Sequence, residues 1–218
     1  MAINRSKVLN AAQKHQRKGN LERAIREYRK LVEDDASDMR SQLKIADLYA
    51  KMGKNVEALT SYKSVAYYYL GDEIFDKAVA IFKQAIRIDG SDPTLYADLG
   101  EAYQRLGRLR EALVQYNHAQ RVYADADERA KQRDVLERMV QLDPDDVNLR
   151  IQLAEQCSKT GMREEAIGLF RYAAAQLEDD GRVADYLKVA ERMVTFEPSN
   201  IELRVKIARI YIQERDFK

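Results

Sequence analysis

The chain has 218 residues, of which 45% are hydrophobic and 33% are charged. Its 37 basic and 36 acidic residues leave a formal net charge of +1, which gives no overall attraction for nucleic acid or for an anionic membrane. Only three prolines and nine glycines interrupt a composition that favours helix almost throughout. No apolar run approaches the ~20 residues of a membrane span, and the first residues lack the apolar core of a secretory signal. With a single cysteine, which cannot form an internal disulfide, these features predict an all-helical cytoplasmic protein.

The first predicted pair of elements lies in residues 5–38, where Gly19, Ala24 and Tyr28 follow one another. The same order then recurs at a step of 54 residues. The recurring positions are Gly53, Gly107 and Gly161, then Ala58, Ala112 and Ala166, then Tyr62, Tyr116 and Phe170. Self-similarity at a fixed period is the signature of a repeat protein. We therefore predict units at about 5–38, 39–92, 93–146 and 147–200, with a partial unit at 201–218.

Each 54-residue unit has room for three helices, which in the unit 39–92 are expected at about 41–52, 56–70 and 74–88. The glycine relieves the backbone where one helix ends and the next begins. The alanine five residues later lets two helices approach closely, and the aromatic residue four positions beyond it fills the gap between neighbouring helices. The recurring motif is therefore expected to serve packing rather than chemistry.

The segment 93–126 resembles a tetratricopeptide repeat. It carries the small and aromatic residues of that motif at Tyr96, Leu99, Gly100, Tyr103, Gly107, Ala112, Tyr116 and Ala119, with Tyr96 in place of the usual tryptophan. The resemblance implies that residues 1–218 form a single right-handed superhelical solenoid of about twelve antiparallel helices, with 54-residue three-helix units after a first 34-residue repeat. Three helices per unit leave open which helices line the concave face.

Residues 201–218 begin another unit, and the apolar residues Ile207, Ile210 and Tyr211 there have no following helix to cover them. An uncovered apolar face at the end of a solenoid normally calls for a capping element. Two interpretations stand open. The chain is the N-terminal part of a longer protein, or a second copy covers this face.

The sequence contains none of the motifs that mark enzyme sites, so we predict no catalytic, cofactor-binding or metal-binding residue. His15 and His118 lie 103 residues apart, and neither has a second metal ligand three or four positions away. Both are therefore expected to be half-exposed helix residues.

Cys157 takes a position that tyrosine holds in the other units, and it is expected to be a small buried apolar residue. Acidic clusters stand at 33–38, 125–128 and 177–182, where one helix is expected to end and another to begin. We expect these carboxylates to cap the following helices and to offset the helix dipole.

Three consecutive tyrosines, Tyr67, Tyr68 and Tyr69, cannot all face one side of a helix, because adjacent residues are ~100° apart. Tyr69, whose counterparts are Tyr123 and Leu177, is predicted to lie in the core. Either Tyr67 or Tyr68 is predicted to contact a partner, with an ordinary surface tyrosine as the equal alternative.

In a repeat solenoid, the polar positions outside the packing motif contact partners along the groove. On this basis the first helix of each unit and the tyrosine run supply the candidate partner-binding residues, which are Arg17, Lys44, Asp47, Lys51, Tyr67, Tyr68, Asp98, Glu101, Arg105, Gln152, Glu155 and Lys159. The lysine and asparagine clamp with which some tetratricopeptide domains hold the C-terminal carboxylate of chaperones is missing, since Leu43 and Asp47, or Ala97 and Glu101, stand at its positions. A ligand of that class is therefore disfavoured.

The resemblance implies a non-enzymatic scaffold or adaptor that binds a peptide, a helix or a small globular protein such as a small GTPase in its groove. The chain is similar to long bacterial tetratricopeptide proteins of delta-proteobacterial type, which suggests a setting in cell polarity, motility or pilus assembly. Two alternatives remain. The chain is a substrate-recruiting region of a larger enzyme whose catalytic domain is absent here, or it is a self-assembly module.

Overall fold

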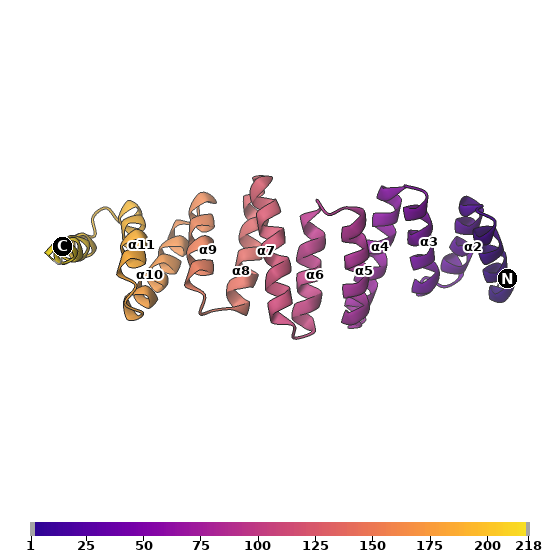
Figure 1. Cartoon of the computed structure of the whole chain (residues 1–218), viewed down its shortest axis with the longest axis horizontal. Coiled ribbons are helices and arrows are strands. Elements are labelled where there is room, and N and C mark those ends of the chain that lie inside the picture. The colour runs from indigo at the N-terminus through magenta and orange to yellow at the C-terminus, as the bar shows by residue number, and fades with distance from the viewer. Residues whose placement is uncertain (1–2, 217–218) are drawn as a thin grey trace. The chain divides into compact units, whose positions relative to one another are not determined.

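The computed structural model describes residues 3–216, and over this range the chain forms twelve α-helices and no strand (Figure 1). The helices are α1 Arg5–Arg17, α2 Leu21–Asp34, α3 Met39–Lys51, α4 Asn55–Gly71, α5 Phe75–Ile88, α6 Pro93–Arg105, α7 Leu109–Asp125, α8 Arg129–Leu142, α9 Val147–Lys159, α10 Arg163–Asp179, α11 Val183–Phe196 and α12 Ile201–Asp216. The prediction of an all-helical fold is confirmed. The described residues fall into two compact units that divide between Val122 and Tyr123, termed here the N-terminal unit and the C-terminal unit.

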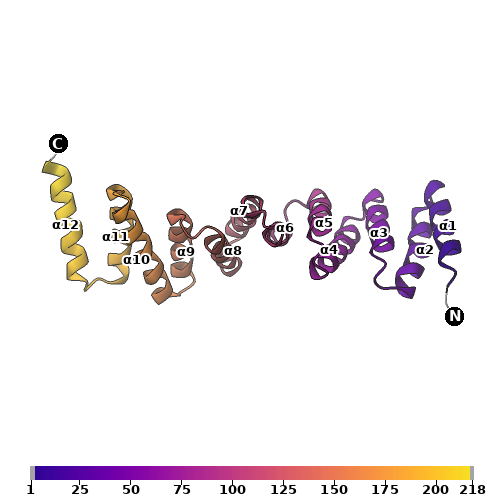
Figure 2. The ribbon, with the colours of Figure 1, turned by 90° about the horizontal axis from the view of Figure 1, so that it is seen from below.

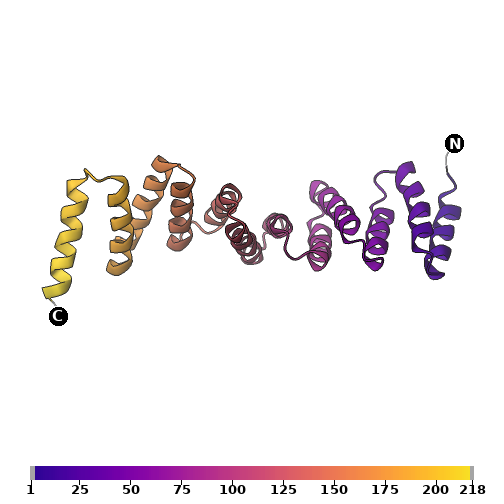
Figure 3. The ribbon, with the colours of Figure 1, turned by 90° about the horizontal axis from the view of Figure 1, so that it is seen from above.

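A single solenoid over the whole chain, and its right-handed superhelix, stay predictions. Residues 1–2 and 217–218, which the predicted solenoid includes, lie outside the described residues. Within the N-terminal unit, each helix from α1 to α6 packs against the next one (Figure 2). The same holds for α8 to α12 in the C-terminal unit (Figure 3).

The 54-residue step of the sequence reappears in the boundaries of the helices. The helices α3, α6, α9 and α12 begin at residues 39, 93, 147 and 201, and α2, α5, α8 and α11 begin at residues 21, 75, 129 and 183. The predicted helices at 41–52, 56–70 and 74–88 correspond to α3, α4 and α5, with ends that differ by at most two residues. The step also makes the pair α1 and α2 equivalent to α4 and α5. No helix within the described residues is long and apolar enough to cross a membrane.

Seven of the turns between helices have one residue in the left-handed conformation, and these turns fall into two sets. The turns after α3, α6 and α9 use Gly53, Gly107 and Gly161, with φ of 69°, 72° and 82°, as the sequence predicts. The turns after α1, α4, α7 and α10 use Gly19, Glu73, Asp127 and Gly181, which also follow the 54-residue step. Because only glycine adopts this conformation at no steric cost, Glu73 with φ of 60° and Asp127 with φ of 54° hold unfavourable backbone geometry.

Aspartate side chains begin three of the helices. The Oδ1 atoms of Asp38, Asp92 and Asp146 accept backbone N–H groups at the starts of α3, α6 and α9, at distances of 2.8 to 3.2 Å. The prediction that the acidic cluster 33–38 caps a helix is therefore confirmed. The same prediction is wrong for 125–128 and 177–182, because the N-cap residues of α8 and α11, Glu128 and Arg182, form no side-chain cap bond.

The recurring small and aromatic residues form the cores of both units. The three motif alanines, Ala58, Ala112 and Ala166, are fully buried, as are the aromatic rings that follow each of them. A close contact joins α6 and α7, where a Cβ atom on Gly100 would lie 2.8 Å from the ring of Tyr116. The motif thus serves packing, as the sequence predicts.

Candidate interaction grooves

The candidate partner-binding residues all lie on helix surfaces, and none is fully buried. The exposed ones are Arg17, Lys44, Lys51, Tyr67, Arg105, Gln152 and Lys159, and the half-buried ones are Asp47, Tyr68, Asp98, Glu101 and Glu155. Lys44 lines a groove in the N-terminal unit, and Glu155 and Lys159 line a groove in the C-terminal unit. Each of these grooves lies between two helices that are separated by one helix in the chain.

The first groove lies between α1 and α3 in the N-terminal unit, has a volume of about 370 Å³ and has α2 at its base. Gln13 and Lys44 line its two walls, and Tyr28 lies beneath them. Lys44 therefore lines this groove, and its Nζ atom also lies 3.5 Å from Oδ2 of Asp47 on its own helix.

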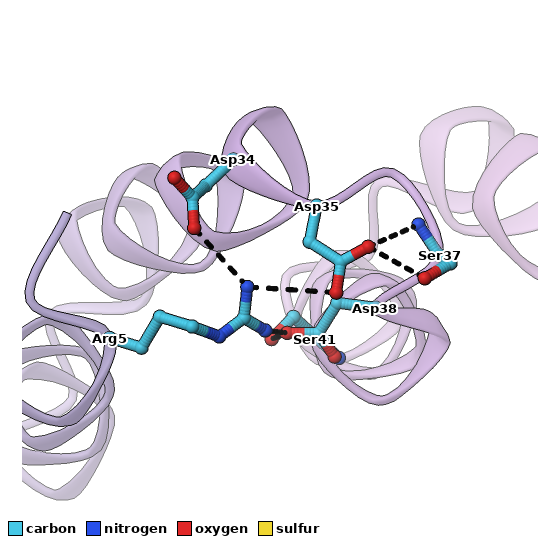
Figure 4. Close-up of polar contacts among 6 residues, drawn as sticks. All are labelled: Arg5, Asp34, Asp35, Ser37, Asp38 and Ser41. Atoms are coloured by element: carbon cyan, nitrogen blue, oxygen red, sulfur yellow. Dashed lines mark hydrogen bonds and ion pairs between the residues drawn. The ribbon is translucent and has the colours of Figure 1, made fainter. Parts of the chain in front are cut away.

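Arg5 links α1 to the loop before α3 at one end of this groove (Figure 4). Its Nη2 atom donates to Oδ2 of Asp38 at 2.7 Å, and its Nη1 atom lies 3.4 Å from Oδ2 of Asp34 and 3.7 Å from Oδ2 of Asp35. Ser37 and Ser41 donate further hydrogen bonds to Asp35 and Asp38. The carboxylates of Asp34, Asp35 and Asp38 are thus already engaged within the protein, so we assign these three residues a structural role.

An equivalent arrangement joins α4 and α6. The hydroxyl of Tyr67 donates to Oδ2 of Asp98 at 2.5 Å, and its ring lies edge-on to Phe82 of α5 at 5.7 Å between centroids. One turn away, Nζ of Lys63 donates to Oδ2 of Asp92 at 2.6 Å. The structure therefore brings the candidates Tyr67 and Asp98 together, but they bind each other.

Burial changes the pKa values of the side chains in these contacts. Burial raises the pKa of Asp98, and the hydrogen bond from Tyr67 offsets this effect only in part. Burial and then the bond to Asp98 raise the pKa of Tyr67. At Asp92, burial also acts upward, but the bonds from Lys63 and Thr94 outweigh it and lower the pKa. The folded protein therefore destabilises the ionised form of Asp98 and stabilises the ionised form of Asp92.

The acidic candidates one turn further along α3 and α6 also have partners. Oδ1 of Asp47 accepts the hydroxyl of Tyr62 at 2.9 Å, and Glu101 lies 4.0 Å from Arg105. By contrast, Arg17 and Lys51, at the ends of α1 and α3, form no side-chain hydrogen bond or ion pair within the described residues.

A groove with a volume of about 650 Å³ lies between α9 and α11 in the C-terminal unit. A second hollow of about 270 Å³ continues it toward the C-terminal ends of both helices. Glu155, Phe170, Arg192 and Thr195 line both hollows, so they mark the centre of one continuous groove. Lys159 borders the second hollow, whereas the candidate Gln152 lines neither.

The base of the α9–α11 groove differs chemically from the equivalent position in the N-terminal unit. Phe170 stands where Tyr62 stands 108 residues earlier, and Glu155 stands where Asp47 stands. The phenylalanine has no hydroxyl to donate, so the carboxylate of Glu155 lacks the bond that Asp47 receives. Within the described residues, neither Glu155 nor Arg192 forms a side-chain hydrogen bond or an ion pair.

The prediction for the tyrosine run is wrong at one position. Tyr69 is half-buried rather than part of the core, because the flexible side chain of Lys77, whose Nζ atom lies 5.0 Å from the ring centroid, covers it incompletely. Tyr68 is also half-buried and lies edge-on to Tyr69. Tyr67 is 45% exposed and is the tyrosine of the three that the structure leaves most accessible.

The remaining reactive residue types carry no site. Cys157 is fully buried, and burial raises the pKa of its thiol to about 11, which confirms the prediction of an apolar core residue. His15 is half-buried, and His118 is exposed and stacks on Tyr96 at 5.3 Å between centroids. The described residues contain no group of three or more His, Cys, Asp and Glu side chains that could hold a metal ion.

Sequence reasoning missed one wall of the α9–α11 groove. In the unit 147–200 the candidates came only from the first helix, whereas Arg192, Lys188 and Thr195 belong to the third helix. The replacement of tyrosine by Phe170 at a recurring aromatic position was visible in the sequence and could have directed attention to this groove.

This arrangement defines a helical-repeat protein with open grooves between alternate helices. Comparison with family models matches residues 66–107 to a TPR repeat and residues 93–126 to a tetratricopeptide repeat. The second match has the bounds that the sequence motif predicts. Residues 66–126 therefore carry tetratricopeptide repeats.

Several solved structures are similar to this chain. MamA from Desulfovibrio magneticus RS-1 is 16% identical over 82% of this chain and 98% of that chain, with a TM-score of 0.29. RapI in its apo form is 11% identical over 98% of each chain, with a TM-score of 0.38. PilF from Pseudomonas aeruginosa is 16% identical over 98% of this chain and 91% of that chain, with a TM-score of 0.33. At these TM-scores the similarities carry no argument about a role or a partner. A search of curated protein sequences finds no match.

Proposed function

We propose that this chain is a non-enzymatic scaffold that holds a segment of a partner protein in a groove between its helices. The observation that carries the proposal is the α9–α11 groove, which runs along two helices and has a buried aromatic base. Its lining includes the charged side chains of Glu155 and Arg192, which form no side-chain hydrogen bond or ion pair within the part of the chain that the structure describes. Sites for small molecules are mostly apolar and enclosed, whereas protein interfaces combine apolar anchors with a polar rim. The α9–α11 groove has the composition of a protein interface.

The more specific form of the proposal follows from the tetratricopeptide resemblance. It places the scaffold in a bacterial cytoplasm, in cell polarity, motility or pilus assembly, with a small globular protein such as a small GTPase among the partners. The tetratricopeptide repeats at 66–126 support the scaffold role.

Affinity capture with variant baits tests the proposal. The baits are the unchanged chain, Lys159→Glu in the C-terminal unit, and the control Arg87→Glu in the N-terminal unit, at an exposed residue outside the described grooves. We expect the unchanged chain and the N-terminal variant to capture the same protein and Lys159→Glu to lose it. The captured protein, once purified, must then give a saturable binding curve with the chain. A capture that no purified protein reproduces would contradict a scaffold role.

A second candidate function is self-association through α12. Ile201, Val205 and Ile212 lie along one face of this helix and are 73%, 41% and 61% exposed. Exposed apolar faces of this kind favour association. A mass that rises with protein concentration would support it, and a constant monomer mass would exclude it.

A further inference from the structure

We infer that the α9–α11 groove takes its partner segment as an extended peptide, held by its main chain between Glu155 and Arg192. This inference rests on the proposed scaffold function and specifies the conformation and chemistry of the bound segment. It starts from the centre of the groove, which both hollows share.

The two walls of the groove offer complementary hydrogen-bonding groups at this centre. Glu155, on α9, is a carboxylate that only accepts hydrogen bonds, and Arg192, on α11, is a guanidinium that only donates them. Neither uses that capacity within the described residues. A ligand that supplies both an N–H donor and a C=O acceptor would satisfy both walls.

An extended main chain supplies these groups, because its N–H and C=O groups point sideways along both edges. A helix does not, because its main-chain groups already bond one another. The walls therefore favour an extended segment over a helical one. Side chains of an extended segment alternate between two faces, so every second one would point toward the base of the groove.

The base of the groove defines which side chains fit. Phe170 and Val189 are 1% and 3% exposed, and Ile151 is half-buried beside them, so the base is apolar. At the far end, Lys159 adds a positive charge next to Phe196. The matching segment has an apolar residue over Phe170 and an acidic residue toward Lys159.

The equivalent positions on α3 and α5 lack this combination. There the carboxylate of Asp47 accepts the hydroxyl of Tyr62, and Gln84 stands where Arg192 stands. In the intervening repeat, Glu101 and Arg138 have the same charges as Glu155 and Arg192, but Tyr116 keeps the hydroxyl that Phe170 lacks. The loss of this hydroxyl distinguishes the α9–α11 groove from both equivalent positions.

Panning of a displayed library of random 12-residue peptides against the full chain tests the inference. The best peptide is then synthesised, and its affinity is measured for the unchanged chain, for Glu155→Ala with Arg192→Ala, and for the matched control Glu33→Ala with Arg87→Ala. Glu33 and Arg87 are exposed and lie outside every groove described above. We expect a loss of about tenfold or more in the groove variant only, since hydrogen bonds to charged groups are lost. We also expect a similar loss when single backbone amides of the peptide are N-methylated.

Each other outcome overturns the inference. A peptide that binds as a helix, or that tolerates N-methylation at every position, would show that the groove does not recognise an extended main chain. A peptide could bind the groove variant with unchanged affinity and lose its binding on a substitution in the α1–α3 groove. This result would be consistent with the scaffold function and would rule out the α9–α11 groove as the binding site. The absence of any binding peptide, together with a failed affinity capture, would contradict both this inference and the proposed scaffold function.

Discussion

Two glycines, Gly100 and Gly168, differ in how closely other side chains pack around them. Gly100 touches the ring of Tyr116, whereas Gly168, inside α10, has no atom within 4 Å of the place a Cβ would take. The same substitution is therefore expected to act in opposite directions at these positions.

Gly100→Ala should lower the free energy of unfolding by about 1–3 kcal/mol, because the new methyl group forces the Tyr116 ring to move in a filled core. Gly168→Ala should raise it by up to about 1 kcal/mol, since alanine is the better helix former. Urea unfolding followed by circular dichroism measures both. If Gly100→Ala proved as stable as the unchanged chain, the contact between α6 and α7 would be wrong.

The charge state of Asp98 gives a second prediction at this scale. Because its folded pKa lies above the ordinary value of 3.8, its contribution to stability is present when it is protonated and is lost as the pH rises through the folded pKa. Asp98→Asn keeps an acceptor for Tyr67 and removes the buried charge. We therefore expect the variant to melt at a higher temperature than the unchanged chain at pH 7, with the difference vanishing near pH 3.

Asp92→Asn is the matched control, and the sign is reversed. Its folded pKa is lowered, so its ionised form contributes stability above the ordinary pKa of 3.8, and this contribution is lost as the pH falls through the folded pKa. The variant should melt at a lower temperature at pH 7 and approach the unchanged chain in acid. Equal shifts for both variants would refute the burial assigned to Asp98.

Among the elements, the left-handed conformation of some turns between helices can be predicted from the sequence, and that of others cannot. Glycine marks the turns after α3, α6 and α9, so the residue type alone reveals the backbone conformation. The turn after α4 has the same left-handed geometry at Glu73, a residue type that gives no such signal. Helix boundaries were predictable for the same reason that packing was, because both follow the recurring small and aromatic residues.

Glu73→Gly should raise the free energy of unfolding by about 1 kcal/mol, because glycine relieves the steric cost of the left-handed conformation. Gly181→Ala, at the equivalent turn after α10, should lower it by a similar amount. Thermal melts of the two variants, recorded together, measure the effects. Destabilisation by Glu73→Gly would mean that the turn is not left-handed.

At the scale of the whole molecule, the repeat that fixes the fold also explains why function was harder to predict. The packing positions recur every 54 residues, and their chemistry hardly changes. The groove positions change more along the chain. One of them holds Ala80, Asp134 and Lys188 in successive repeats, and another holds Gln84, Arg138 and Arg192. The sequence identified Glu155 and Lys159 but not the facing wall of α11, because only the fold shows which helices lie across a groove from each other.

The most direct test of the account is a photo-crosslinking map of the partner. A benzophenone side chain is introduced at Asn148, which lines the α9–α11 groove, at Gln13, which lines the α1–α3 groove, and at Ala80, which is exposed on α5 outside both. We predict that the partner protein found by affinity capture crosslinks most strongly at Asn148 and only at background level at Ala80. Equal crosslinking at all three positions, or crosslinking at Ala80 alone, would contradict a function carried by the grooves.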